Sequence, residues 1–165
     1  MTLPTGVAEV LAALSARGQS LALAESLTGG MLADAFVRVP GASAVLRGSI
    51  VAYQTPLKAS LLGVPAGMLA EHGPVHPEVA ARMAEGARSA AAIDGRPADV
   101  GLATTGVAGP EPQGSAAVGL VFVAVADEAG TVSREHHFLG DRAEIRAQAV
   151  TAAIELLVER VGSRE

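Results

Sequence analysis

Ser26, Lys58 and Tyr53 are the side chains whose types best fit nucleophilic chemistry. Lys58 is the only lysine among twelve basic residues, and Tyr53 is the only tyrosine. A serine hydroxyl becomes a nucleophile when a base removes its proton, and a neutral lysine amine can be that base. Arginine cannot, because its guanidinium stays protonated. Composition alone leaves three plainer readings open: a chance surface lysine, a half-buried strand tyrosine and a serine that only caps a helix.

Ser26 and Lys58 each lie near a predicted helix N-terminus. Ser26 sits between a predicted buried strand and a predicted helix, and Lys58 lies in the first turn of a helix that begins at Thr55-Pro56. Helix N-termini carry free N–H groups and partial positive charge. They can bind a developing oxyanion, and their charge together with burial lowers the pKa of a nearby amine.

Two further segments could contact a ligand. Arg142 opens the last predicted helix, where an anion clamp and a plain salt bridge are both open readings. The segment 104–110 follows a buried strand, but it matches neither the Walker phosphate loop nor the dinucleotide-binding fingerprint. Alone it indicates only ligand binding at a strand end.

The elements that must position these residues follow from hydrophobic periodicity and from turn residues. Helices mixed with apolar strands favour an α/β layer fold, and a C-terminal β-hairpin makes the sheet mixed. We expect one three-layer α/β/α domain over residues 1–165. The predicted elements are a helix from 7 to a stop at Gly18, a strand over 20–24, a helix from 26 or 27 to 39, a strand over 44–53, helices over 55–62, over 65–72 and from 77, strands over 100–104, 118–126 and 131–139, and a last helix from 141.

Composition excludes several classes of function. The formal net charge of -5 and the 2% aromatic content argue against nucleic-acid binding, which needs basic surface and stacking side chains. The absence of cysteine excludes disulfides, thiolate metal sites and a cysteine nucleophile. No apolar run is long enough to span a bilayer. We therefore expect a cytoplasmic protein that binds neither membranes nor nucleic acid.

The four histidines do not predict a metal centre. His72, His76, His136 and His137 show no metal-ligand spacing with acidic partners. His136 and His137 alternate faces of a strand, and His76 precedes Pro77 as an expected helix cap. We expect no metal and no cofactor.

Ordered motifs along nearly the whole chain resemble one known family, the CinA C-terminal domains of the competence-damage-inducible proteins. One motif alone would be weak, but the ordered set is specific. The motifs are Ala24-Glu25-Ser26-Leu27-Thr28-Gly29-Gly30, Val39-Pro40-Gly41-Ala42-Ser43, Val51-Ala52-Tyr53 with Lys58, Leu61-Leu62-Gly63-Val64, Thr105-Gly106-Val107-Ala108-Gly109-Pro110, Val118-Gly119 and Gly140-Asp141-Arg142.

The resemblance implies an activity: a metal-independent amidohydrolase that converts nicotinamide mononucleotide to nicotinic acid mononucleotide and ammonia, in pyridine-nucleotide salvage. It also implies a three-layer fold, often in a homodimer, and a role for each matched residue. The implied roles are nucleophile for Ser26, base for Lys58, assisting hydroxyl for Tyr53, oxyanion and substrate contacts for Thr28, Gly29 and Gly30, substrate loop for Thr105, Gly106 and Gly109, and substrate-binding arginine for Arg142.

The sequence departs from the family pattern beside the expected ligand. Glu111-Pro112-Gln113-Gly114 replaces a glycine-rich stretch, and Ala116-Ala117 replaces a usual Lys-Pro. Two alternatives therefore stand beside the amidohydrolase. One is a non-catalytic nucleotide-binding or partner module that kept the fold, and the other is an amidase for a different small amide.

Overall fold

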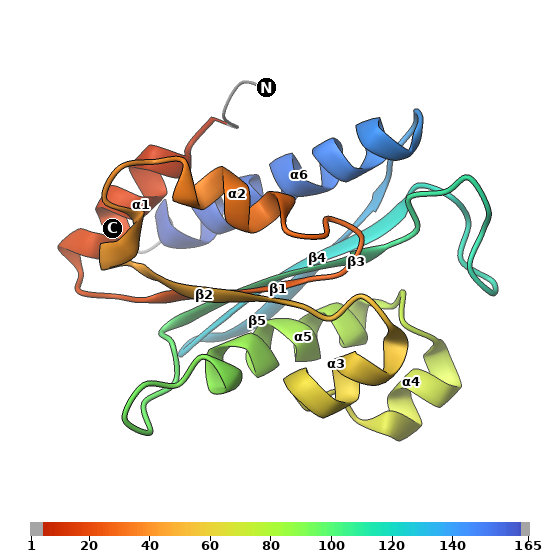
Figure 1. Ribbon diagram of the computed structural model, residues 1–165, viewed down its shortest axis with the longest axis horizontal. Helices are drawn as coiled ribbons and strands as arrows, with labels where there is room; N and C mark the ends of the chain where they lie inside the picture. The colour runs from red at the N-terminus through yellow and green to blue at the C-terminus, as the bar shows by residue number, and fades with distance from the viewer. Residues whose placement is uncertain (1–4, 163–165) are drawn as a thin grey trace.

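The computed structural model describes residues 5–162, which form a five-stranded sheet between two layers of helices (Figure 1). The strand order is β2-β1-β3-β4-β5, with β1, β2 and β3 parallel and β4 antiparallel to both β3 and β5. The expected mixed sheet with a C-terminal hairpin is confirmed. The strands are β1 (Leu21–Glu25), β2 (Leu46–Val51), β3 (Val100–Gly106), β4 (Leu120–Asp127) and β5 (Gly130–His137).

Three helices cover each face of the sheet (Figure 1). One layer holds α1 (Val7–Ala16), α2 (Met31–Val37) and α6 (Arg142–Gly162), and the 3-10 turn η1 (Ala42–Ala44) lies beside it. The other layer holds α3 (Thr55–Leu62), α4 (Ala66–His72) and α5 (Pro77–Ala90). This confirms the three-layer α/β/α arrangement. Within residues 5–162, no helix combines the length and the apolar character needed to cross a membrane.

Side chains alternate along the strands and so divide the core in two. In β1, Leu21 and Leu23 face the α1/α2/α6 layer, while Ala22 and Ala24 face the α3/α4/α5 layer. Small residues on the second face let α5 approach closely: a Cβ added at Gly86 would lie 1.9 Å from the carbonyl oxygen of Leu62. Because α3 and α5 meet backbone to backbone, α3 is held in a fixed position.

The parallel strands bring three chain segments to one edge of the sheet. The carboxyl ends of β1, β2 and β3 lie side by side, so the segments that follow Glu25, Val51 and Gly106 start together. In open α/β sheets, ligands bind outside these strand ends. The fold therefore places Ser26 and Tyr53 beside the loop after β3.

One predicted helix start is wrong. The helix expected from Ser26 or Leu27 begins only at Met31, because Gly29 and Gly30 take positive φ values of 56° and 98° that interrupt helical geometry. Ser26 therefore lies in a turn and does not cap the helix. The predicted start of α3 at Thr55 is confirmed, and Gln54 occupies the capping position before it.

Candidate active site

Ser26 and Lys58 form a buried hydrogen-bonded pair at the end of β1. The Lys58 Nζ lies 2.9 Å from the Ser26 Oγ and 2.8 Å from the carbonyl oxygen of Ala52. Lys58 is 1% exposed. Burial lowers the pKa of its ammonium group from 10.5 to about 8, since desolvation disfavours the charged form. A neutral fraction of Lys58 therefore exists near neutral pH and can accept the Ser26 proton.

A buried carboxylate, which the sequence reasoning missed, shapes the turn that carries Ser26. Glu25 is 0% exposed, and its side chain reaches across the Gly29-Gly30 break to cap α2. The N–H groups at the start of α2 are thus satisfied inside the protein. The carboxylate oxygens accept from Thr28 Oγ1 (2.8 Å), Gly30 N–H (2.9 Å), Leu32 N–H (3.0 Å), Ala33 N–H (3.0 Å) and Ser49 Oγ (2.8 Å).

Arg146 holds the same turn from the opposite side. Its Nε donates to the Leu27 carbonyl oxygen at 2.8 Å, and its Nη2 donates to the Thr28 carbonyl oxygen at 2.9 Å. Arg146 was not among the predicted site residues. The signal that could have found it is its position four residues after Arg142, on the same face of the helix. Within residues 5–162, the N–H groups of Leu27 and Thr28 donate to no protein acceptor.

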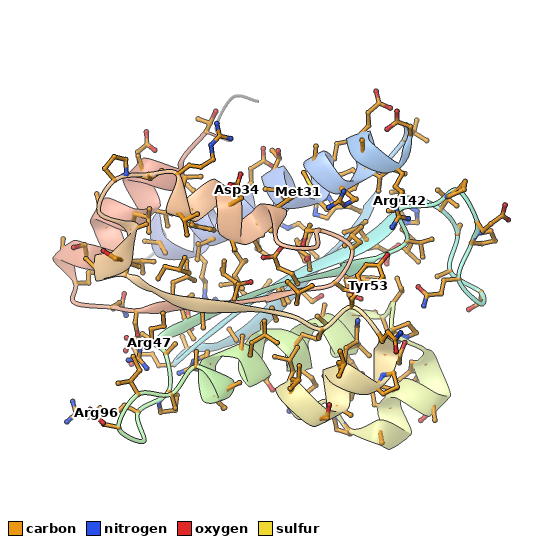
Figure 2. The ribbon with its side chains drawn as sticks, in the orientation of Figure 1. Met31, Asp34, Arg47, Tyr53, Arg96 and Arg142 are labelled. Carbon is orange, nitrogen blue, oxygen red and sulfur yellow. The ribbon has the colours of Figure 1, made fainter. Side chains whose placement is uncertain are left out.

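A cavity of about 200 Å³ opens beside Ser26 at the sheet edge. Arg142 reaches across it: its Nη2 donates to the Tyr53 hydroxyl at 2.9 Å, and its Nη1 donates to the Gly109 carbonyl oxygen. Figure 2 shows Tyr53 and Arg142 at this edge. The lining residues are Ser26, Leu27, Tyr53, Gly106, Val107, Ala108, Gly109, Glu111, Gln113 and Arg142.

Five of the residues singled out from the sequence meet at this cavity, namely Ser26, Tyr53, Gly106, Gly109 and Arg142. Lys58 lies behind Ser26 as its hydrogen-bond partner. The Lys58 amine is held by the Ala52 carbonyl, while the Tyr53 hydroxyl is bonded to Arg142. The proposed assistance of Tyr53 to Lys58 stays a prediction.

Four other expected substrate contacts lie away from the cavity lining. Thr28 is buried, and its hydroxyl lies 2.8 Å from both the Glu25 carboxylate and the Thr104 hydroxyl. The Gly29 N–H donates to the Ser26 carbonyl oxygen at 3.1 Å, and the Gly30 N–H is taken by Glu25. Thr105 Oγ1 donates to the Pro74 carbonyl oxygen at 2.7 Å, because alternate residues of β3 face opposite layers.

The predicted start of the last helix is confirmed as a reciprocal cap. Asp141 Oδ1 accepts the N–H groups of Ala143 and Glu144 at 2.8 and 2.9 Å, and Glu144 Oε2 accepts the Asp141 N–H at 2.7 Å. The cap occupies the N–H groups of Ala143 and Glu144 in the first turn of α6. The guanidinium of Arg142, which lines the cavity, brings a positive charge to this wall.

One cluster differs from the expectation that the histidines show no metal-ligand spacing with acidic partners. His72, His76 and Glu78 place ligand atoms within 4.8 Å of one another. The two rings are stacked, with centroids 4.1 Å apart, and His76 Nδ1 accepts the Glu78 N–H as the expected cap. The lone pairs of the stacked rings lie in two nearly parallel planes, so the rings would have to turn before both could point at one ion.

Comparison with known proteins shows the family of this chain. The model of one family, described as the CinA C-terminal domain, matches residues 5–161. The chain belongs to the CinA C-terminal domain family. Curated CinA-like proteins from Frankia casuarinae and Geobacter metallireducens are 49% and 47% identical to it, over 90% and 87% of this chain. Those alignments cover 33% and 34% of the relatives, so this CinA domain spans about a third of their length.

Solved CinA structures share the whole fold. A competence-damaged protein (CinA) superfamily protein from Klebsiella pneumoniae superposes with a TM-score of 0.90 at 30% identity, covering 99% of both chains. A superfamily member from Escherichia coli gives a TM-score of 0.89 at 30% identity, covering 96% of this chain and 90% of that one. The sheet edge that carries Ser26 is therefore part of a CinA fold.

Proposed function

We propose that this CinA domain hydrolyses the carboxamide of nicotinamide mononucleotide to nicotinic acid mononucleotide and ammonia. The observation that carries the proposal is the 2.9 Å contact between Lys58 Nζ and Ser26 Oγ beside an open cavity. Nucleophile and base within hydrogen-bond reach are the signature of covalent acyl transfer. The motif resemblance supplies the substrate.

The reaction needs only groups of this chain, the substrate and water. Neutral Lys58 accepts the Ser26 proton while the Ser26 oxygen attacks the carboxamide carbon. Lys58 then returns that proton to the amide nitrogen, so ammonia leaves and an acyl-serine remains. Water, deprotonated by Lys58, then attacks the acyl-serine. The bond between the acyl carbon and Ser26 Oγ breaks, and Lys58 returns the proton to Ser26 Oγ as the carboxylic acid leaves.

The oxyanion of each tetrahedral intermediate needs N–H donors that are not already engaged. Gly29 and Gly30 donate to acceptors within the protein. We therefore narrow the oxyanion site to the N–H group of Leu27, which lines the cavity and whose carbonyl oxygen Arg146 holds.

Arg142 is the proposed contact for the substrate phosphate. It lines the cavity, whereas the Thr105 hydroxyl is bonded to Pro74. Arginine suits phosphate because its planar fork can donate two hydrogen bonds.

Ammonia release from nicotinamide mononucleotide by the purified chain tests the function. We expect turnover by the wild type and a loss of at least about 10³-fold in Ser26→Ala, as for other enzymes that lose a nucleophile. Binding of the mononucleotide without turnover would support a non-catalytic module. Faster turnover of another amide would support a different substrate, and activity that survives Ser26→Ala would contradict the serine mechanism.

Tyr53→Phe separates two roles for the tyrosine. The variant removes the hydroxyl that accepts from Arg142 at 2.9 Å. A solvent-exposed contact to a charged group contributes about 0.2–1 kcal/mol, so we expect KM to rise by roughly two- to fivefold while kcat changes little. Steady-state kinetics with Arg142→Gln as the matched variant should show the same pattern. A large fall in kcat with unchanged KM would instead assign Tyr53 to proton transfer with Lys58.

A further inference from the structure

Glu111 brings an unpaired negative charge to the candidate active site. It lines the cavity together with Ser26, Tyr53 and Arg142, and its side chain is exposed. Within residues 5–162, the Glu111 carboxylate has neither a hydrogen-bond donor nor an ion-pair partner. Arg142, on the same cavity, donates to Tyr53 and Gly109 instead.

Hydrogen bonds hold the loop that carries Glu111 at several points. Gln113 and Ala116 exchange two backbone hydrogen bonds of 3.0 Å, which close a tight turn. The base of the same loop is joined by the Gly119 N–H to the Val107 carbonyl oxygen at 2.8 Å. Arg142 also donates to the carbonyl oxygen of Gly109, which lies along the chain between these two sets of hydrogen bonds. The loop, which projects from the sheet edge in Figure 1, therefore keeps Glu111 at the cavity.

The cavity thus presents a cation and an anion that do not form an ion pair with one another. A ligand that satisfies both groups must carry charges of both signs. Nicotinamide mononucleotide is such a ligand, because its alkylated pyridinium ring is cationic and its phosphate is anionic. Resting on the proposed function, we infer that Glu111 is a specificity-determining residue that selects the cationic pyridinium ring over a neutral ring.

The ring charge can be varied while the rest of the ligand is nearly unchanged. The oxidised mononucleotide has a pyridinium ring, and its dihydro form has a neutral ring with the same carboxamide, ribose and phosphate. Calorimetry would give the Kd of both ligands for Ser26→Ala, which cannot acylate, and for the same variant with Glu111→Gln or Glu111→Lys. Glu9→Gln is the matched control, since Glu9 is an exposed glutamate on α1 and does not line this cavity.

We expect Glu111→Gln to lower the preference for the oxidised ligand by roughly three- to fivefold, the range of a partly exposed charge pair. Glu111→Lys should lower it further, and Glu9→Gln should leave it unchanged. An unchanged or increased preference in Glu111→Gln would overturn the inference while leaving the proposed function standing. Failure of every variant to bind either ligand would overturn the proposed function itself.

Discussion

Lys58→Met should lower kcat for ammonia release by about 10²- to 10⁴-fold, the range for loss of a positioned general base. Methionine keeps an unbranched side chain of similar length in the buried position but cannot accept the Ser26 proton. Arg47→Met is the matched control, because Arg47 also donates to backbone carbonyls, those of Ala91 and Arg96. Figure 2 places Arg47 at the other end of the molecule from Tyr53 and Arg142. Equal losses in the two variants would contradict a specific role for Lys58.

The pH dependence of kcat/KM in the wild type also tests Lys58 as the base. The base must be neutral, and burial lowers the Lys58 pKa to about 8. We therefore expect kcat/KM to rise about tenfold per pH unit below pH 8 and to level off above it. An activity that falls from pH 6 to pH 8 would exclude Lys58 as the base.

The stability of the protein should rise with pH between about pH 8 and pH 10.5 because of Lys58. Lys58 has a folded-state pKa of about 8 and an unfolded value of 10.5. Between these values the unfolded chain binds more protons, so stability rises with pH in that window. Below pH 8 the folded state bears the whole cost of the buried ammonium, on the order of 3 kcal/mol. Urea titrations should show Lys58→Met at least as stable as the wild type at pH 7 and without this pH-dependent gain.

Glu25→Ala should give the largest loss of stability. The substitution removes the acceptor of three backbone N–H groups and two hydroxyls in a fully buried site. Buried polar groups left without partners cost about 1–3 kcal/mol each, so we expect a loss of at least about 3 kcal/mol. For a domain of this size that lowers Tm by roughly 6 to 12 °C.

Glu25 also positions Ser26, so activity should fall at temperatures where the variant is still folded. Glu25→Gln keeps the shape and one acceptor oxygen, and it should restore part of both stability and kcat. Asp99→Ala is the control: this exposed carboxylate accepts from the Ser20 N–H and hydroxyl at the start of β1, far from Ser26. A Glu25→Ala variant with a lower Tm but the wild-type kcat at low temperature would show that Glu25 does not position Ser26.

Local sequence patterns predicted most of the fold. The stripe of α5, formed by Val79, Ala80, Met83, Ala84 and Ala87, is buried as helical spacing requires. Pro77 after His76 marked the start of this helix, and Gly63 with φ 67° marked the end of α3. These features depend on neighbours within one turn of the chain, so periodicity and capping residues reveal them.

The contacts that build the candidate site are longer-range and could not be predicted in the same way. Ser26 and Lys58 are separated by 32 positions, and only the ordered motifs linked them in advance. Glu25 escaped notice because it caps a helix that begins six residues later, across a glycine pair. Likewise, strand alternation placed Thr104 and Thr105 on opposite layers, which the motif as a linear string did not reveal. The homodimer and the cytoplasmic location stay predictions.

The contacts of Arg146 give the site an order of assembly. They join Leu27 and Thr28 to a helix 119 and 118 residues further along the chain. Contacts of such separation carry a high cost in loop entropy and tend to form late in folding. On a ribosome, the turn around Ser26 would emerge early and wait for α6 before its carbonyls were held. In the folded protein, fraying of the first turns of α6 would release Arg142 and Arg146 together, dismantling the site while the sheet stays intact.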